Sequence, residues 1–116
     1  MKDYSITTKE GDEGKTGLLD NSRVSKYDLR PEAYGALDEA AAFLGLARAE
    51  TNMEDVKELI LSIQNHIYLI NSELACPPES LHLLKNFLGK DHLAAIEEKS
   101  NEIEKKLNLP RKFVLY

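Results

Sequence analysis

"PEAYGALDEAAAFLGLARAE", residues 31–50, is the stretch that decides the fold. Its alanines and leucines favour a helix, and Pro31 suits a first helical turn, where its missing N–H is not needed. Small residues along the stretch would let a second helix approach closely. Apolar residues recur at steps of three and four, the spacing of one helical face, at Ala33, Leu37, Ala40, Leu44 and Ala47. The stretch therefore predicts a long helix packed against another helix.

Two more long helices are predicted downstream. Asn52 is the expected N-cap of the first, which the prolines of "ACPPES", residues 75–80, should end. Its apolar positions alternate by four and three, as in a packed bundle: Val56, Ile60, Ile63, Ile67, Ile70 and Leu74. A short helix is expected over 80–90, stopped by Gly89. Asp91 should cap the last helix, which Asn108 and Pro110 should close. With no strand pattern of useful length, we predict a single-domain, all-α, up-and-down bundle over residues 1–116.

The composition excludes several classes of function. The chain has 116 residues and a net charge of −5, whereas nucleic-acid and anionic-membrane partners select clustered Lys and Arg. Cys76 is the only cysteine, so no internal disulfide points to an oxidising compartment. No apolar run approaches the roughly 18 residues of a membrane span, and no export region is evident. We expect a cytoplasmic protein with no nucleic-acid or membrane partner.

"TKEGDEGKTGLL", residues 8–19, concentrates glycine, threonine and lysine before the first helix. Glycine lets backbone amides turn toward an anion, and lysine supplies positive charge, so the stretch suggests a phosphate cradle. It is not a P-loop, because that motif ending at Thr16 would need glycine where Lys9 stands, and because it follows a buried strand. On local evidence, a solvated glycine-rich turn is an equal alternative.

Three motifs together resemble the N-terminal half of the PduO-type ATP:cob(I)alamin adenosyltransferases. They are Thr-Lys-x-Gly-Asp-x-Gly-x-Thr at 8–16, Arg-Val-x-Lys at 23–26 and Gly-x-x-Asp-Glu at 35–39. "RKFVLY", residues 111–116, is similar to the family's Lys-Phe-Ile/Val-Leu-Pro-Gly-Gly, with Tyr116 in place of the usual proline. The resemblance implies a ferritin-like, cobalamin adenosyltransferase-like bundle, with a nucleotide-binding loop region over 1–29 and helices over 30–116. The family's last helices, which include an Arg-Arg-Ala-Glu-Arg segment, are absent.

The resemblance also implies a reaction and its participants. The 5′-deoxyadenosyl group of ATP passes to cob(I)alamin, giving adenosylcobalamin and triphosphate, with Mg²⁺ as cofactor. Cobalt is the nucleophile, so the protein must orient the reactants and stabilise the leaving triphosphate. The family acts as a homotrimer with ATP at subunit interfaces, and a corrinoid reductase is a possible partner. The competing interpretation is a nucleotide-binding or structural bundle that lacks catalysis without the last helices.

The residues of the expected site follow from the resemblance. Asp12 is expected to hold the loop through hydrogen bonds to turn amides, Lys15 is read as an exposed lysine, and no residue is assigned as a metal ligand. Asp38 is either a solvated carboxylate or half of a subunit-bridging ion pair with an arginine of the absent helices. Phe113 is either a core residue or an apolar wedge against the corrin. The expected ATP-binding residues are Thr8, Lys9, Gly11, Asp12, Gly14, Thr16 and Lys26.

Overall fold

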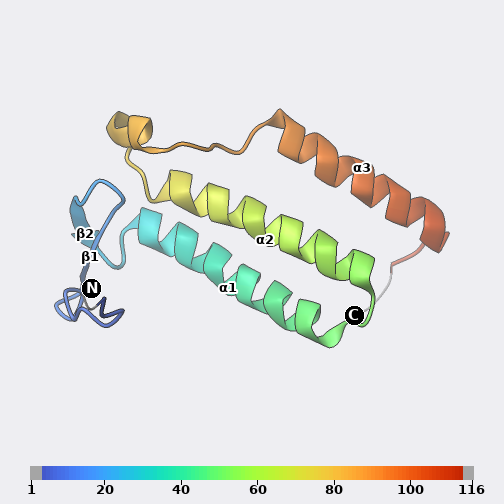
Figure 1. The fold of residues 1–116 in the computed structure, drawn as a ribbon, viewed down its shortest axis with the longest axis horizontal. Coiled ribbons are helices and arrows are strands. Elements are labelled where there is room, and N and C mark those ends of the chain that lie inside the picture. Colours follow the sequence, from blue (N-terminus) through green and yellow to red (C-terminus); the bar gives the residue numbers. More distant parts are fainter. Residues whose placement is uncertain (1–3, 114–116) are drawn as a thin grey trace.

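Three long helices lie side by side in the computed structural model, which describes residues 4–113 (Figure 1). They are α1 (Leu29–Glu50), α2 (Glu54–Leu74) and α3 (Lys90–Leu107), with a 3₁₀ helix, η1 (Pro78–Leu83), between the last two. Successive long helices run in opposite directions, which confirms the predicted up-and-down helical bundle. Among the described residues, no helix is long and apolar enough to cross a membrane.

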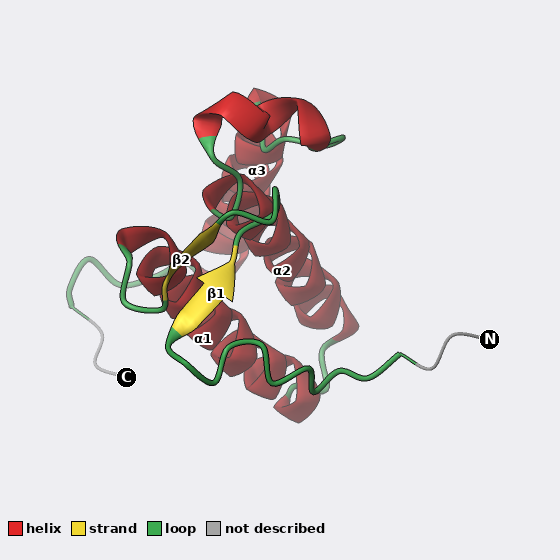
Figure 2. Ribbon diagram, turned by 90° about the vertical axis from the view of Figure 1, so that its left-hand side faces the viewer, coloured by secondary structure: helices red, strands yellow, loops and turns green. Residues whose placement is uncertain are grey.

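A two-stranded antiparallel hairpin precedes the helices and was not predicted from the sequence. It pairs β1 (Lys15–Gly17) with β2 (Arg23–Ser25), and Thr16 stands opposite Val24. Each strand has only three residues, too few to show an alternating pattern. Figure 2 shows this hairpin in front of the ends of α1 and α2, at the end of the bundle that also carries η1.

The ends of α1 are as predicted, and the start of α2 is not. Asp28 caps α1 by accepting a hydrogen bond from the Arg30 N–H at 3.1 Å, so this helix begins at Leu29, Pro31 lies in its first turn, and it ends at Glu50. The predicted N-cap Asn52 is wrong by one position. Met53 is the N-cap of α2, and its N–H donates to Thr51 Oγ1 at 3.3 Å. A threonine hydroxyl in the connection therefore satisfies a donor at this helix start.

The segment between α2 and α3 departs furthest from the predictions. Residues 84–89 are not helical, and Gly89 is the N-cap of α3 instead of the end of a preceding helix. Its N–H donates to His92 Nδ1 at 2.9 Å, while the predicted cap Asp91 lies in the first turn of α3. The Leu88 N–H donates to Glu73 Oε1 at 2.7 Å. A side chain of α2 thus fixes the segment as an extended connection.

Helices α1 and α2 make the closest contact of the bundle. Gln64 Nε2 donates to the Ala41 carbonyl at 3.0 Å. A Cβ built on Gly45 would lie 3.3 Å from the same nitrogen, so the glycine makes room for this approach. Ala40 and Ala47 of the predicted apolar stripe are exposed, whereas Ala41 is half-buried. Ala33, Leu37 and Leu44 are half-buried as predicted, so the predicted stripe is wrong only at Ala40 and Ala47.

The described helices leave much apolar surface open. Ile60 is 8% exposed, and the other apolar positions predicted for α2 are half-buried. Phe43 and Leu46 on α1 are 66% and 59% exposed, and Leu93 on α3 is 59% exposed. Apolar side chains at this exposure gain little from folding of the chain alone. They form faces suited to contact with further protein.

Candidate functional site

Residues 8–26 form a turn and hairpin at one end of the bundle. The Gly14 N–H donates to the Gly11 carbonyl at 3.2 Å, and the Lys26 N–H donates to the Gly14 carbonyl at 2.9 Å. These bonds close the glycine-rich turn and bring Lys26, the last residue of the Arg-Val-x-Lys motif, next to it. Two motifs separated in the sequence thus become one structural unit.

Three residues of this unit adopt left-handed backbone conformations. Gly14 has φ of +80°, which glycine tolerates, while Lys9 and Asn21 have φ of 61° and 66°. Asparagine is enriched in this region, but an ordinary side chain such as lysine rarely adopts it. Strain of this kind concentrates at ligand sites, where it orients backbone groups. Lys9 is exposed, so its ammonium is accessible to a ligand.

Lys26 lies directly over Gly11. A Cβ built on Gly11 would come within 3.0 Å of both Cε and Nζ of Lys26. Any side chain at position 11 would therefore displace the ammonium group. The arrangement places a positive charge beside the backbone of the turn, which is the combination that binds phosphate oxygens.

Arg23 has a role that the sequence reasoning missed. Its Nη2 donates to the Glu10 carbonyl at 2.7 Å and to the Lys15 carbonyl at 3.2 Å. The guanidinium therefore occupies two carbonyl groups, one on each side of the glycine-rich turn. Carbonyl oxygens would repel a bound anion, so this pairing favours anion binding by the turn. Its position in the Arg-Val-x-Lys motif was the available signal.

An open hollow of about 450 Å³ lies against the hairpin. Three of the seven predicted ATP-binding residues line it, while Lys9, Asp12, Gly14 and Lys26 do not. Asp12 is exposed, and within residues 4–113 its side chain makes no hydrogen bond, so the predicted bonds to turn amides are wrong. The residues that line the hollow are Thr8, Glu10, Gly11, Thr16, Gly17, Leu18, Asn21 and Arg23.

Asp38 and Phe113 lie away from this unit. Asp38 is exposed on α1 and accepts a hydrogen bond from Asn71 Nδ2 of α2 at 2.8 Å. Phe113 is 101% exposed, so its interpretation as a core residue is wrong for the described chain. It follows the end of α3 that lies at the opposite end of the molecule from the hairpin (Figure 1). The predicted loop residues thus lie together at one end of the bundle, and Asp38 and Phe113 lie apart from them.

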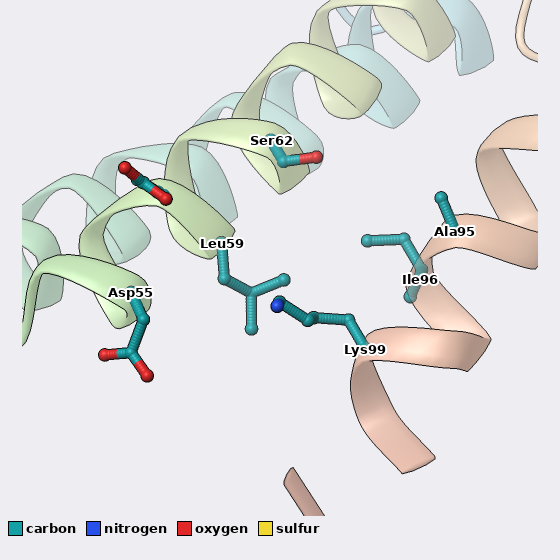
Figure 3. Close-up of a pocket in the computed structure, with 7 residues that line it drawn as sticks. Asp55, Leu59, Ser62, Ala95, Ile96 and Lys99 are labelled. Carbon is teal, nitrogen blue, oxygen red and sulfur yellow. The ribbon is translucent and has the colours of Figure 1, made fainter. Parts of the chain in front are cut away.

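A second hollow, of about 220 Å³, separates α2 from α3. Figure 3 shows Lys99 of α3 extending toward α2 beside Leu59 and Ile96. A hydrogen bond and the charge of Glu102 raise the pKa of Lys99. Its ammonium already has that carboxylate as a partner at 3.1 Å. In the part of the chain that the structure describes, no three His, Cys, Asp or Glu side chains gather into a metal site.

The fold and the loop together define a helical-bundle protein that carries a glycine-rich turn, with Lys26 beside it, at one end. The chain belongs to the cobalamin adenosyltransferase family, whose model matches residues 6–116.

Related proteins agree with this assignment. The chain is 35% identical over 95 residues to a corrinoid adenosyltransferase of Citrobacter freundii, covering 82% of this chain and 54% of that protein. It is 42% identical over 77 residues to a cobalamin adenosyltransferase of Cupriavidus metallidurans, covering 66% of this chain and 42% of the relative. The chain thus spans about half the length of the curated relatives it matches.

A solved structure has a similar fold over nearly the whole chain. It is a variant of the PduO-type ATP:corrinoid adenosyltransferase from Lactobacillus reuteri, complexed with cobalamin and ATP. The TM-score is 0.87 at 25% sequence identity, and the match covers 96% of this chain and 62% of the other.

Proposed function

We propose that this chain supplies the ATP-binding part of a corrinoid adenosyltransferase. The observation that carries the proposal is the contact of Lys26 with Gly11, which sets a cation against a turn of glycine amides. Three predicted ATP-binding residues line the adjoining hollow, and Arg23 engages two nearby carbonyls. The similar Lactobacillus reuteri structure, complexed with cobalamin and ATP, supports the same class of ligand.

The proposed reaction needs no protein nucleophile. The cobalt of cob(I)alamin donates an electron pair to the ribose C5′ of ATP, a Co–C5′ bond forms, the C5′–O bond breaks, and triphosphate leaves with that electron pair. The tasks left to the chain are orientation and charge stabilisation. Lys9 and Lys26 are proposed to hold the polyphosphate, with the hydroxyls of Thr8 and Thr16 and the backbone near Gly11.

The roles of Mg²⁺, Asp38 and Phe113 are further parts of the proposal. Protein-bound Mg²⁺ keeps several waters and relies on substrate phosphates, so we assign it to the nucleotide and not to a protein cage. Asp38 is proposed to form an ion pair across a subunit interface, for which its exposed place on α1 is suitable. The fully exposed ring of Phe113 is available as an apolar wedge against a corrin.

A homotrimer is the proposed assembly. The exposed apolar side chains Phe43, Leu46 and Leu93 support it, because burying them between subunits would be favourable. Residues such as Gly35 and Ala42 would allow close helix contact. The proposed location is the cytoplasm, where ATP and a corrinoid reductase are available.

The test combines binding and catalysis on the full chain. Calorimetry with Mg-ATP should show binding that weakens in Lys26→Ala but not in Lys85→Ala, a matched exposed lysine outside the loop. Chemically reduced cobalamin is then added with Mg-ATP, and adenosylcobalamin is followed by its visible spectrum. Binding with product formation supports the enzyme. Binding without product supports the nucleotide-binding bundle instead, and absence of binding rejects both.

A further inference from the structure

Asp20 connects the hairpin to a distant part of the chain. Its Oδ1 accepts hydrogen bonds from Ser22 N–H at 3.0 Å and Ser22 Oγ at 2.6 Å. Its Oδ2 accepts from Ser80 Oγ at 2.9 Å, across 60 sequence positions. Ser80 lies in η1 and is 8% exposed. One carboxylate thus bonds to the connection of the hairpin and to a buried hydroxyl beyond α2.

We propose that Asp20 is a positioning residue that docks the ATP-binding loop onto η1 and sets its orientation relative to the helices. This inference rests on the proposed function, because the loop is the proposed site of ATP binding. Asn21, the next residue, lines the hollow at the hairpin. A shift of Asp20 would therefore move the wall of that hollow.

The surface that receives Asp20 is itself held firmly. Cys76 is 1% exposed, and its Sγ donates to the Ser80 carbonyl at 3.1 Å. Arg30 Nη1 donates to the carbonyls of Leu74 and Cys76 at 2.9 and 3.3 Å. These bonds tie the end of α2 and the start of η1 to α1. Ser80 is consequently a fixed point, against which Asp20 can position the loop.

A backbone contact reinforces the docking but does not replace it. The Leu19 N–H donates to the Ala75 carbonyl at 2.9 Å, and Leu18 is 7% exposed. The bond from Ser80 to Asp20 adds a side-chain attachment between the hairpin and this end of the bundle, which restricts movement of the hairpin further.

Two possible roles of Asp20, charge and positioning, predict opposite changes in ATP affinity when its carboxylate is removed. A carboxylate near bound polyphosphate repels it, so removing the carboxylate would strengthen ATP binding if charge alone mattered. Removing a positioning residue should weaken ATP binding. Asp20→Asn separates the two effects, because it removes the charge but keeps an oxygen for Ser22 and offers an amide that the Ser80 hydroxyl can accept from.

The experiment compares Asp20→Ala, Asp20→Asn and Ser80→Ala in the full chain. Ser72→Ala is the matched control, because Ser72 Oγ donates only within α2, to the Tyr68 carbonyl at 2.9 Å. Hydrogen–deuterium exchange is measured for peptides covering residues 8–26 without ATP, and Mg-ATP affinity is measured by calorimetry. The exchange measurement does not depend on the proposed function.

Asp20→Ala and Ser80→Ala should each accelerate exchange in the loop and weaken Mg-ATP binding by about fivefold to tenfold, the size expected for loss of the hydrogen bond between these two residues, which both variants remove. Asp20→Asn should remain within about twofold of the parent chain, since geometry is retained. Tighter ATP binding in both Asp20 variants, or loop exchange in Ser80→Ala equal to that in Ser72→Ala, overturns the proposal. If the parent chain binds no ATP but Asp20→Ala and Ser80→Ala still exchange faster in the loop, the proposed function is rejected and the inference that Asp20 docks the loop is supported.

Discussion

Asn71 on α2 donates a hydrogen bond from Nδ2 to Oδ1 of Asp38 on α1, at 2.8 Å. A carboxylate accepts but does not donate, so this contact fixes which way the amide points. Asn71 Oδ1 is then buried without a hydrogen-bond partner among the described residues. The proposed subunit-bridging carboxylate is therefore already held in place by its own chain.

This contact predicts a loss of stability in Asp38→Ala. Removing the acceptor leaves the Asn71 amide with neither of its polar atoms paired, so the free energy of unfolding should fall by about 1 kcal/mol. Urea unfolding measures the change. Glu39→Ala is the control, because Glu39 is an exposed carboxylate on the same helix. Equal effects of the two substitutions would show that the contact contributes nothing.

Gly14→Ala and Gly35→Ala should change stability in opposite directions. At neither glycine would an added Cβ meet an atom within 4 Å, so only the backbone decides, and Gly14 has φ of +80°. Alanine is strained there and should cost about 1 kcal/mol. Gly35 lies within α1, where alanine should add about 0.5–1 kcal/mol. Thermal unfolding tests both, and a destabilising Gly35→Ala would instead indicate a neighbouring subunit at that face.

Arg23→Lys should weaken Mg-ATP binding roughly tenfold, because lysine keeps the charge but its side chain is one bond shorter than that of arginine, whose terminal Nη2 reaches both carbonyls. The carbonyls of Glu10 and Lys15 would lose the partner they share. Calorimetry measures the affinity. Arg48→Lys is the control, since within residues 4–113 the Arg48 side chain bonds only to Gln64, at 3.4 Å. An unchanged affinity in Arg23→Lys would mean that charge alone accounts for this residue.

The stabilising effect of Asp20 should depend on pH. The Ser22 hydroxyl, followed by the Ser22 N–H and the Ser80 hydroxyl, lowers the pKa of Asp20. A carboxyl whose folded pKa lies below the unfolded value of about 3.9 stabilises the fold above that value and loses the effect as pH falls through the folded pKa. The parent chain should have a larger free energy of unfolding than Asp20→Asn, by the same amount at about pH 7 and pH 5 and by a smaller amount near pH 3. An advantage that grows on acidification would contradict the hydrogen bonds described.

Periodicity was sufficient to predict the long helices, because each is a local pattern repeated over several turns. The sequence could not reveal that Gly89 begins α3, since that depends on the bond from Leu88 to Glu73 of another helix. The same limit applies to the site. Adjacent motifs led to Gly11 and Lys26, whereas the bond between Asp20 and Ser80 joins residues 60 positions apart, which no local pattern encodes.

Gln64 bonds to the Ala41 carbonyl beside Gly45, and this contact also helps to set the axial position of α1 relative to α2. A displacement of one turn, about 5.4 Å, would bring Gln64 opposite a different carbonyl. The position that Gly45 now leaves open would then be filled by the methyl group of Ala41 or Ala49. Alanine repeats along α1 distinguish poorly between neighbouring alignments. One missing methyl group and one side-chain amide therefore help to select a single axial alignment of the two helices, together with the bond from Asn71 to Asp38.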